Sequence, residues 1–416
     1  MLWGRKAGTL VASRDGYKNR ICFYFDPEFV RNGYDIAPLR APIAGNVARG
    51  GLPVYPETDR MFGGLPSFIA DSLPDRWGNT VFNEWAKSRK ISSRNLTALD
   101  RLAYIGRRGM GALEFVPPTS AEMEQPFMVD IDDLYKLSRQ ALEDAKNIHS
   151  TWHHDFAIES LFKVGTSAGG RRPKAVINVD FNRGEFYSGQ VPAPLPGFTP
   201  MIIKFDEHCD IPTTRIEYSY YLMALDAGLV MMPGQLLEVN GQAHFLTQRF
   251  DRDGDEKVHV QTLAAINPLA DSYEDLFDVA CRIGVPPVEI RQIFRSMVMN
   301  VIAGNVDDHN KNFSFTMGKD GAWHFAPTYD FTFAVDLSAP AYVNCHAMSI
   351  CGKSESIEKS DLLELAGRYN IRGAESYISK AVTVVRNYSE YAKRAGVPED
   401  WAQRIREVIE LRLSML

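Results

Sequence analysis

A run of six polar residues, Asp-Asp-His-Asn-Lys-Asn from Asp307 to Asn312, constrains this chain more than any other feature. A helical pattern of apolar residues ends just before it at Gly304, so the run is predicted to lie on a loop. Another aspartate, Asp330, follows after the length of a short hairpin. In phosphoryl transfer an aspartate accepts the proton of the attacking hydroxyl, a later asparagine binds metal, and a further aspartate chelates Mg²⁺. Asp307, Asn312 and Asp330 have this order and spacing, which indicates a phosphotransferase.

A simpler explanation of the same run is that it only turns the chain. Asp and Asn are common turn formers, and a polar segment after a helix is often just a loop. That explanation stays open for each residue taken singly. It accounts poorly for the whole set, because a turn does not require an unbroken cluster of potential Mg²⁺ ligands. Segments 313–317 and 323–325 predict the two strands of the hairpin between the run and Asp330.

The composition is that of an ordinary globular protein. With 416 residues the chain has room for two or three domains, and its net charge of −6 gives no global electrostatic basis for direct binding to nucleic acid or an anionic membrane. The five cysteines lack metal-binding spacing and favour a reducing compartment. No apolar run is long enough to span a bilayer, and the N-terminus does not resemble a signal peptide. We therefore expect a cytoplasmic protein without a membrane partner.

The order of predicted elements indicates an α+β fold. Segment 116–127 has the composition of a linker, which places the end of an N-terminal subdomain at residue 127. A sheet-containing part is expected over 128–255 and a mainly helical part over 256–416. Strands are predicted at 8–12, 20–25, 175–179, 201–205, 235–239 and 243–247, and helices at 76–86, 130–146, 156–163, 215–227, 273–284, 287–303, 360–369, 374–394 and 398–415. A sheet-rich half followed by a helical half is the order of bilobal kinases.

A glycine-rich segment at 165–174 is a candidate phosphate-binding loop. Its glycines would let backbone N–H groups approach a phosphate without interference from side chains. A flexible hairpin end has the same composition, and the segment matches neither the Walker pattern nor the usual protein-kinase loop. The glycines of segment 106–115 fit no phosphate-binding pattern and predict turns.

Two further segments are candidates for the nucleotide site. Lys204 lies in the apolar segment 201–205, where a buried ammonium group would need an anion such as a phosphate. An alternating strand with its polar face in water explains Lys204 equally well. Glu217, on the following predicted helix, is the candidate ion-pair partner of Lys204, as in kinases. The backbone of 248–250 could bind an adenine edge, although Phe250 could simply belong to the core.

Three of these motifs together resemble the HipA family of serine/threonine kinases: the loop at 164–174, the Arg-Phe-Asp-Arg turn at 249–252, and the run at 307–312. Segments 71–78 and 106–115 are similar to the N-terminal domain of that family, so the resemblance covers nearly the whole chain. It implies a bilobal fold akin to phosphoinositide-3-kinase-like enzymes, with a small N-terminal α/β subdomain and a mainly helical C-terminal lobe.

The resemblance also implies a function. The cofactors would be ATP and Mg²⁺. The protein substrate would be an aminoacyl-tRNA synthetase such as glutamate–tRNA ligase, whose phosphorylation inhibits translation and arrests growth. The chain would be the toxin of a type II toxin–antitoxin pair. Its partner would be a helix-turn-helix antitoxin similar to HipB and, through it, operator DNA.

Residue by residue, the resemblance makes Asp307 the proton acceptor and Asn312 and Asp330 the metal ligands. Ser167 is implied as the site of autophosphorylation, where nearly two added negative charges would oppose ATP and silence the enzyme. The residues implied to bind the nucleotide are Ala168, Gly169, Gly170, Arg171, Arg172, Pro173, Lys174, Lys204, Gln248, Arg249, Phe250, His309, Asn310, Lys311, Asn312, Tyr329 and Asp330.

Two alternative functions remain open at this point. Asp307, His309 and Asn312 also resemble the DRHxxN motif of lipid kinases, so the chain could phosphorylate a lipid or another small molecule. It could also be a non-catalytic corepressor that binds DNA through an antitoxin. The lack of a basic membrane-binding run argues against the first alternative, and the complete catalytic set argues against the second.

Overall fold

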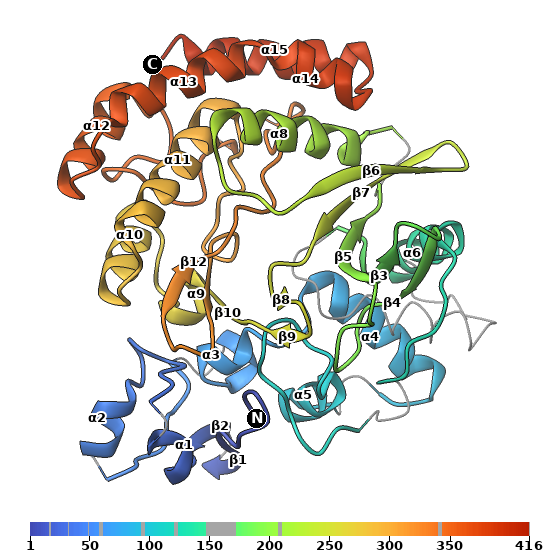
Figure 1. Cartoon of the computed structure of the whole chain (residues 1–416), viewed down its shortest axis with the longest axis vertical. Coiled ribbons are helices and arrows are strands. Elements are labelled where there is room, and N and C mark those ends of the chain that lie inside the picture. Colours follow the sequence, from blue (N-terminus) through green and yellow to red (C-terminus); the bar gives the residue numbers. More distant parts are fainter. Residues whose placement is uncertain are drawn as a thin grey trace. The chain divides into compact units, whose positions relative to one another are not determined.

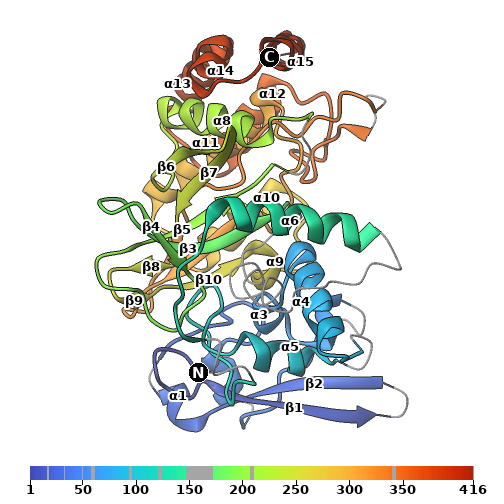
Figure 2. The ribbon, with the colours of Figure 1, turned by 90° about the vertical axis from the view of Figure 1, so that its right-hand side faces the viewer.

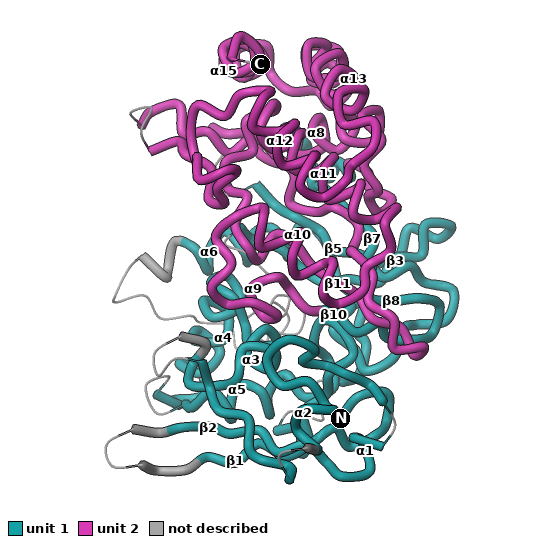
Figure 3. The backbone as a smooth tube through the Cα atoms, turned by 90° about the vertical axis from the view of Figure 1, so that its left-hand side faces the viewer, with its two compact units in different colours: residues 1–209, 237–260 teal, residues 210–236, 261–416 magenta. Residues whose placement is uncertain are grey.

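The computed structural model of the chain (Figure 1, Figure 2) describes residues 1–15, 18–31, 33–48, 50–57, 61–92, 96–119, 124–146, 172–206, 210–339 and 343–415. The chain forms two compact units, which Figure 3 shows in different colours. Unit 1 comprises residues 1–209 and 237–260, and unit 2 comprises residues 210–236 and 261–416. The boundaries predicted after residues 127 and 255 divide the chain by sequence and stay predictions.

The N-terminal part of unit 1 begins with a hairpin of β1 (Gly8–Asp15) and β2 (Lys18–Phe25), whose strands pair antiparallel as predicted (Figure 2). The predicted helix at 76–86 is α4 (Arg76–Ser88), which begins where the Asp75 carboxylate accepts the N–H of Gly78. Aromatic rings of α4 pack with Tyr104 of α5 (Ala98–Ile105). The shorter elements are α1 (Pro27–Arg31), α2 (Ile43–Ala48), η1 (Met61–Gly64) and α3 (Ser67–Ala70).

A five-stranded sheet forms the rest of unit 1, in the order β4-β3-β5-β7-β6. Its strands are β3 (Lys174–Asp180), β4 (Glu185–Ser188), β5 (Thr199–Lys204), β6 (Gly234–Val239) and β7 (Gln242–Gln248), of which β4 was not predicted. Alternate residues of β3 and β5, including Ile177 and Ile203, share a core with Ile131 and Leu134 of α6 (Ile131–Lys146). Because side chains alternate along a strand, Lys174 and Lys204 point to the opposite face of the sheet. Two short strands, β8 (Arg252–Asp253) and β9 (Glu256–Lys257), follow.

Unit 2 is mainly helical and is built around α11 (Pro287–Ala303), which contacts α10 (Tyr273–Arg282), α13 (Ala374–Arg386) and α15 (Glu399–Leu413) (Figure 1). The other helices of unit 2 are α8 (Thr213–Ala227), α9 (Leu263–Ile266), α12 (Lys359–Arg368) and α14 (Tyr388–Ala395). A sheet of order β10-β11-β12 consists of His259–Thr262, Ser314–Met317 and Trp323–Phe325, and β10 begins at the end of unit 1. Strands β11 and β12 form the predicted antiparallel hairpin.

The prediction of one helix over 374–394 was wrong, because the structure ends α13 at Arg386 and begins α14 at Tyr388. The break lies at Asn387, whose side-chain amide donates to the C=O of Thr383 while its backbone N–H donates to the C=O of Val384. An asparagine side chain that competes for backbone groups in this way favours a helix end over a helix interior. Among the helices that the structure describes, none is long and apolar enough to cross a lipid bilayer.

A buried histidine in unit 1 predicts an acid-sensitive step in stability. His244 on β7 is 1% exposed, and its ring lies against Tyr135 and Phe205. In the part of the chain that the structure describes, neither of its ring nitrogens has a hydrogen-bond partner. Burial lowers the pKa of His244 from 6.5 to about 4, although the charge of Asp132 opposes this in part. Between these values the unfolded chain binds a proton that the folded chain does not, so the free energy of unfolding falls as the pH decreases.

We expect the His244→Phe variant to lose this acid-sensitive step. At pH 5 the wild-type chain should lose about 2 kcal/mol of unfolding free energy through this group relative to pH 7.5, and the variant should keep it. Urea unfolding at a series of pH values measures the difference. His309→Phe is the matched control, because the His309 side chain is 43% exposed and its replacement should leave the wild-type slope unchanged. A variant slope equal to that of the wild type would contradict the assignment.

Candidate catalytic loop and nucleotide site

The polar run lies on a loop at the end of α11, as predicted. Gly304 ends the helix with a positive φ of 77°, a conformation that glycine adopts without strain. The Asp307 side chain is 72% exposed and is therefore accessible to a substrate hydroxyl. His309 Nδ1 accepts the N–H of Lys311, which leaves the ring proton on Nε2, 3.9 Å from Asp307 Oδ1. The loop thus presents an exposed carboxylate beside an imidazole N–H.

Asn312 is held by the loop itself. Its backbone N–H donates to the C=O of His309 at 2.8 Å, and its side-chain Nδ2 donates to the C=O of Asp307 at 2.7 Å. Because the amide nitrogen binds the loop, the amide oxygen is left to act as an acceptor. Asn310 is anchored differently, since its Nδ2 donates to the C=O of Ala270. Of the two amides in the run, Asn312 is the one whose orientation depends on the residue predicted to be the base.

Asp330 follows the β11–β12 hairpin in a conformation that is uncommon outside glycine, with a φ of +51°. Such backbone strain persists only where the surroundings hold it, and it concentrates at functional sites. Phe331, the next residue, is buried against the ring of Tyr220, with ring centroids 5.3 Å apart. The buried Phe331 therefore anchors the backbone next to Asp330.

Tyr329 ties this segment to the polar run. Its hydroxyl donates to the C=O of Lys311 at 2.8 Å and lies 2.5 Å from Ser314 Oγ. Lys311 immediately precedes Asn312, and Tyr329 immediately precedes Asp330. The hydrogen bond from the Tyr329 hydroxyl to Lys311 therefore connects the residues next to the two predicted metal ligands. Carboxylate and amide oxygens are ligands that suit Mg²⁺, which needs only one or two from the protein when substrate phosphates and waters supply the others. Asn312 and Asp330 therefore fit the predicted ion in the type of donor they offer.

We expect Tyr329→Phe to reduce phosphoryl transfer, the activity that the sequence predicts, by about ten- to a hundredfold, because Asp330 and Asn312 would no longer be held together. The free energy of unfolding should fall by only about 1 kcal/mol, the worth of a lost hydrogen bond. Steady-state kinetics and urea unfolding measure both effects. Tyr391→Phe is the matched control, because it removes a hydroxyl bound to Asp226 between α14 and α8. Equal transfer by the two variants would show that Tyr329 does not position the site.

Asp308, the neighbour of Asp307, has a different environment. It is fully buried and accepts three hydrogen bonds, from Tyr273 OH at 2.7 Å, His346 Nδ1 at 2.8 Å and the N–H of Ala347 at 2.8 Å. Burial and then the Asp308 charge raise the pKa of Tyr273 well above its ordinary value, so its hydroxyl stays protonated and donates. Asp308 therefore fixes the loop from inside unit 2 and is not positioned to receive a substrate proton.

Further residues contact the hydrogen-bond partners of Asp308. Asn300 Nδ2 donates to Tyr273 OH, and Arg412 Nη1 lies 3.2 Å from His346 Nε2. Sequence reasoning missed Tyr273, His346 and Arg412, which lie far from Asp308 along the chain. No local spacing connects them, so only the packing of α10, α15 and the 343–350 segment around the loop reveals them.

In unit 1, Lys174 and Lys204 are direct cross-strand partners on β3 and β5. Both are buried, with residue exposures of 4% and 8%, and they share one face of the sheet. The strand pairing therefore places two positively charged side chains on the same part of that face. Trp77 Nε1 donates to the C=O of Lys174 at 2.8 Å, so the N-terminal helix α4 fixes the backbone at the end of the glycine-rich segment.

The Arg-Phe-Asp-Arg turn contains a buried ion cluster. Arg249 forms a two-pronged pair with Asp251, with both N···O distances at 2.8 Å, and Arg252 Nη1 binds the same carboxylate at 2.7 Å. Burial alone would raise the pKa of Asp251, but the two guanidinium charges outweigh it and hold that pKa well below its usual range. The N–H of Gly111 also donates to Asp251, and the C=O of Gly109 accepts from Arg252.

This cluster limits how the turn could contact an adenine. The Arg249 side chain is used within the protein, and its backbone N–H donates to the C=O of Pro200. A nucleotide contact by Gln248, Arg249 and Phe250 would therefore involve other backbone groups of the turn, as the sequence reasoning expected of this segment. Of the glycines in 106–115, Gly111 and Gly109 bond Asp251 and Arg252, and Gly106 ends α5.

Several predicted residues lie outside the part of the chain that the structure describes. These are Ser167, Ala168, Gly169, Gly170 and Arg171, together with the helix expected at 156–163. Arg172 and Pro173 are described and lead into β3. Lys204 and Glu217 are both buried but belong to different units, so their ion pair stays a prediction.

Two family models match the chain. The model of the HipA N-terminal domain matches residues 1–116, and that of the HipA-like C-terminal domain matches residues 166–411. A protein of Sinorhizobium fredii named "Putative kinase Y4mE" is 27% identical over 184 residues, which are 40% of this chain and 42% of that protein. The chain thus matches less than half the length of this curated relative.

Solved structures show the fold. HipA of Shewanella oneidensis MR-1, solved in complex with HipB and its operator DNA, has a TM-score of 0.65 and 17% identity, covering 98% of this chain and 94% of that one. The two chains share a mixed α/β fold. The Helicobacter pylori proinflammatory kinase CtkA covers 54% of this chain and 90% of its own at 13% identity, with a TM-score of 0.37 that is too low to establish a common fold.

Proposed function

The chain belongs to the HipA family, and from this premise we propose that it is an ATP- and Mg²⁺-dependent serine/threonine-protein kinase with a bilobal, phosphoinositide-3-kinase-like fold. The observation that carries the proposal is the contrast within the polar run. Asp307 is exposed beside an imidazole N–H, whereas Asp308 is buried under three donors. A loop built in this way offers one accessible carboxylate in a fixed place.

The roles of the loop residues follow from their contacts. Asp307 would accept the proton of the substrate hydroxyl, and the N–H of His309 Nε2 would orient its carboxylate. Asn312 and Asp330 would hold Mg²⁺, which when bound supplies charge neutralisation to the nucleotide phosphates. Tyr329 would keep these two ligands in register through its bond to the C=O of Lys311. His309, Asn310 and Lys311 complete the nucleotide-facing loop.

Unit 1 contains the other residues that the sequence predicts to bind the nucleotide. Lys204 and Lys174 would bind phosphates from one face of the sheet, with Arg172, Pro173 and the glycine-rich segment covering them. The backbone of 248–250 would contact the adenine, on a turn that the buried Asp251 cluster holds rigid. Kinases place a strand lysine and a hinge backbone in these same roles.

The physiological role that we propose is that of a toxin. The protein substrate would be an aminoacyl-tRNA synthetase such as glutamate–tRNA ligase, and its phosphorylation would inhibit translation and arrest growth. A HipB-like helix-turn-helix antitoxin would bind the chain and connect it to operator DNA, as HipB and DNA accompany the Shewanella HipA. Autophosphorylation of Ser167 would place negative charge where the ATP phosphates bind and would switch the enzyme off.

Incubation of the purified chain with radiolabelled ATP and Mg²⁺ tests this proposal. We expect label in the chain itself, lost in Ser167→Ala and retained in the matched variant Thr166→Val, and label in added glutamate–tRNA ligase. Label only in a lipid extract would support a lipid kinase instead. No transfer at all, with growth arrest unchanged by Asp307→Asn, would support the corepressor.

A further inference from the structure

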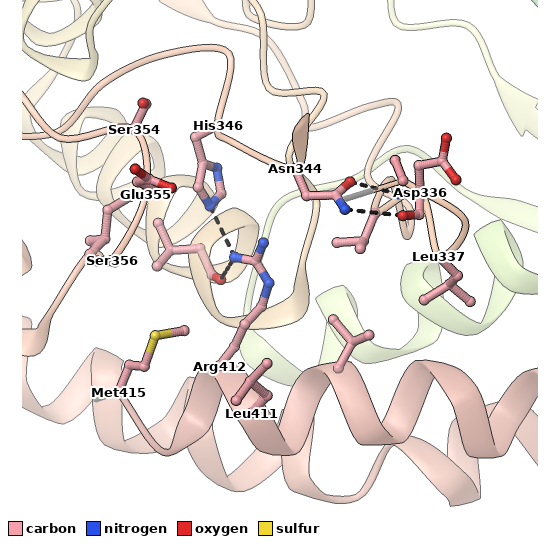
Figure 4. Close-up of a pocket in the computed structure, with 15 residues that line it drawn as sticks. Asp336, Leu337, Asn344, His346, Ser354, Glu355, Ser356, Leu411, Arg412 and Met415 are labelled. Atoms are coloured by element: carbon pink, nitrogen blue, oxygen red, sulfur yellow. Dashed lines mark hydrogen bonds between the residues drawn. The ribbon is translucent and has the colours of Figure 1, made fainter. Parts of the chain in front are cut away.

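A pocket of about 440 Å³ opens in unit 2 beside the support of the catalytic loop (Figure 4). Its walls come from the end of α11, the segments 335–339, 344–346 and 354–357, and α15. Most of the lining surface is apolar. The apolar residues include Val301, Val335, Val408 and Leu411, and the polar ones include His346 and Arg412.

Arg412 is the cation of this pocket. One of its nitrogens, Nη1, binds the C=O of Val301 at 3.1 Å and lies 3.2 Å from His346 Nε2. Within the described ranges its Nε and Nη2 atoms have no hydrogen-bond partner, and no carboxylate lies within 4.0 Å of its guanidinium group. Burial lowers the pKa of Arg412, and electrostatic interactions with Tyr220 and Asp308 partly oppose this shift. A partly buried guanidinium with a free edge is a receptor for a planar anion.

Arg412 lies beside the end of α11. A Cβ added to Gly304 would lie 3.4 Å from Arg412 Nε, which is an ordinary van der Waals distance. The loop that forms another wall is closed by Asn344, whose side-chain amide bonds both the N–H and the C=O of Asp336 (Figure 4). The two acids of the pocket, Asp336 and Glu355, are exposed, so water and salt screen them more than the guanidinium. The pocket therefore combines fixed walls with a cation that is less exposed than its acids.

We propose that this pocket binds a small carboxylate with a short aliphatic body. The carboxylate would form a two-pronged pair with Nε and Nη2 of Arg412. The aliphatic body would lie against Val301, Val335 and Val408. His346 would connect this site to Asp308, because its ring contacts Arg412 through Nε2 and Asp308 through Nδ1. Arg412 would therefore contact both the bound anion and the residues that support the proposed catalytic loop. This site is separate from the proposed nucleotide site, and its existence does not depend on phosphoryl transfer.

Calorimetric titration of the full chain with sodium hexanoate tests the proposal. We expect one site, with affinity rising about fourfold for each added methylene from butyrate to hexanoate as the pocket buries it. Hexylammonium chloride should not bind, and inorganic phosphate should bind more weakly than hexanoate. Equal affinities for butyrate and hexanoate, or no binding of either, would overturn the proposal.

Two variants localise the site. Arg412→Gln should abolish hexanoate binding, whereas Arg404→Gln on the same helix, which removes a guanidinium stacked on Trp401 outside the pocket, should leave it unchanged. If Arg412→Gln fails to fold, Leu411→Asn gives the test instead, because Leu411 lines the pocket but is 65% exposed. It should weaken hexanoate more than butyrate. Wild-type binding by a folded Arg412→Gln chain, or by Leu411→Asn, would show that the ligand lies elsewhere.

Discussion

The Asp307→Asn variant is expected to lose phosphoryl transfer by about a hundred- to ten-thousandfold while keeping the wild-type fold. General-base catalysis typically contributes a rate factor of this size. The asparagine amide of the variant cannot accept the proton of the attacking hydroxyl, so this factor should be lost. The Asp307 side chain is 72% exposed, and among the described residues the basic group within 4.0 Å of its carboxylate is the His309 ring, with Nε2 at 3.9 Å. Its replacement therefore removes the chemistry without removing any buried contact.

Single-turnover kinetics with ATP and Mg²⁺ measure the loss, and urea unfolding checks that stability is unchanged. Asn312 depends on the backbone C=O of Asp307 and not on its carboxylate, so the predicted metal ligand should stay in place in the variant. A measurement of nucleotide affinity can verify this, since it should change little. A variant that retains the wild-type rate would remove Asp307 from its proposed role.

The Asp308→Asn variant is expected to show the opposite pattern, with a loss of about 3–5 kcal/mol in the free energy of unfolding. The Asp308 carboxylate accepts hydrogen bonds from Tyr273, His346 and the N–H of Ala347. An amide can accept at only one of its two ends, so one donor would face another donor in a buried place. Arg412 would also lose the negative charge that it approaches through His346.

The two neighbouring substitutions are matched controls for each other, since both replace aspartate by asparagine one residue apart. Urea unfolding should show a large loss of stability for Asp308→Asn and little change for Asp307→Asn. The Asp308→Asn chain should lose phosphoryl transfer only to the extent that it unfolds or that the geometry of its loop changes. A stable, inactive Asp308→Asn chain beside a fully active Asp307→Asn chain would reverse the two assignments.

Much of the fold follows from local patterns. The alternation in β3 and β5, the apolar spacing along α11 and the stop at Gly304 all predict elements that the structure contains. Strand β4 escaped notice because it is short, and the break at Asn387 because its cause is a side chain bonded to the preceding turn. Local sequence patterns indicate whether a long segment forms a helix or a strand. Short strands and helix breaks depend instead on individual contacts, which these patterns do not show.

The proposed catalytic loop was likewise predictable from the sequence only in part. The sequence by itself determined the order and spacing of Asp307, Asn312 and Asp330, the residue types that the proposed phosphoryl transfer requires. Only the tertiary structure decided that Asp308, next to Asp307, is buried, and that Arg412 contacts its hydrogen-bond partner His346. Their partners come from helices and segments far apart in the chain, and burial is a property of packing that no local spacing encodes.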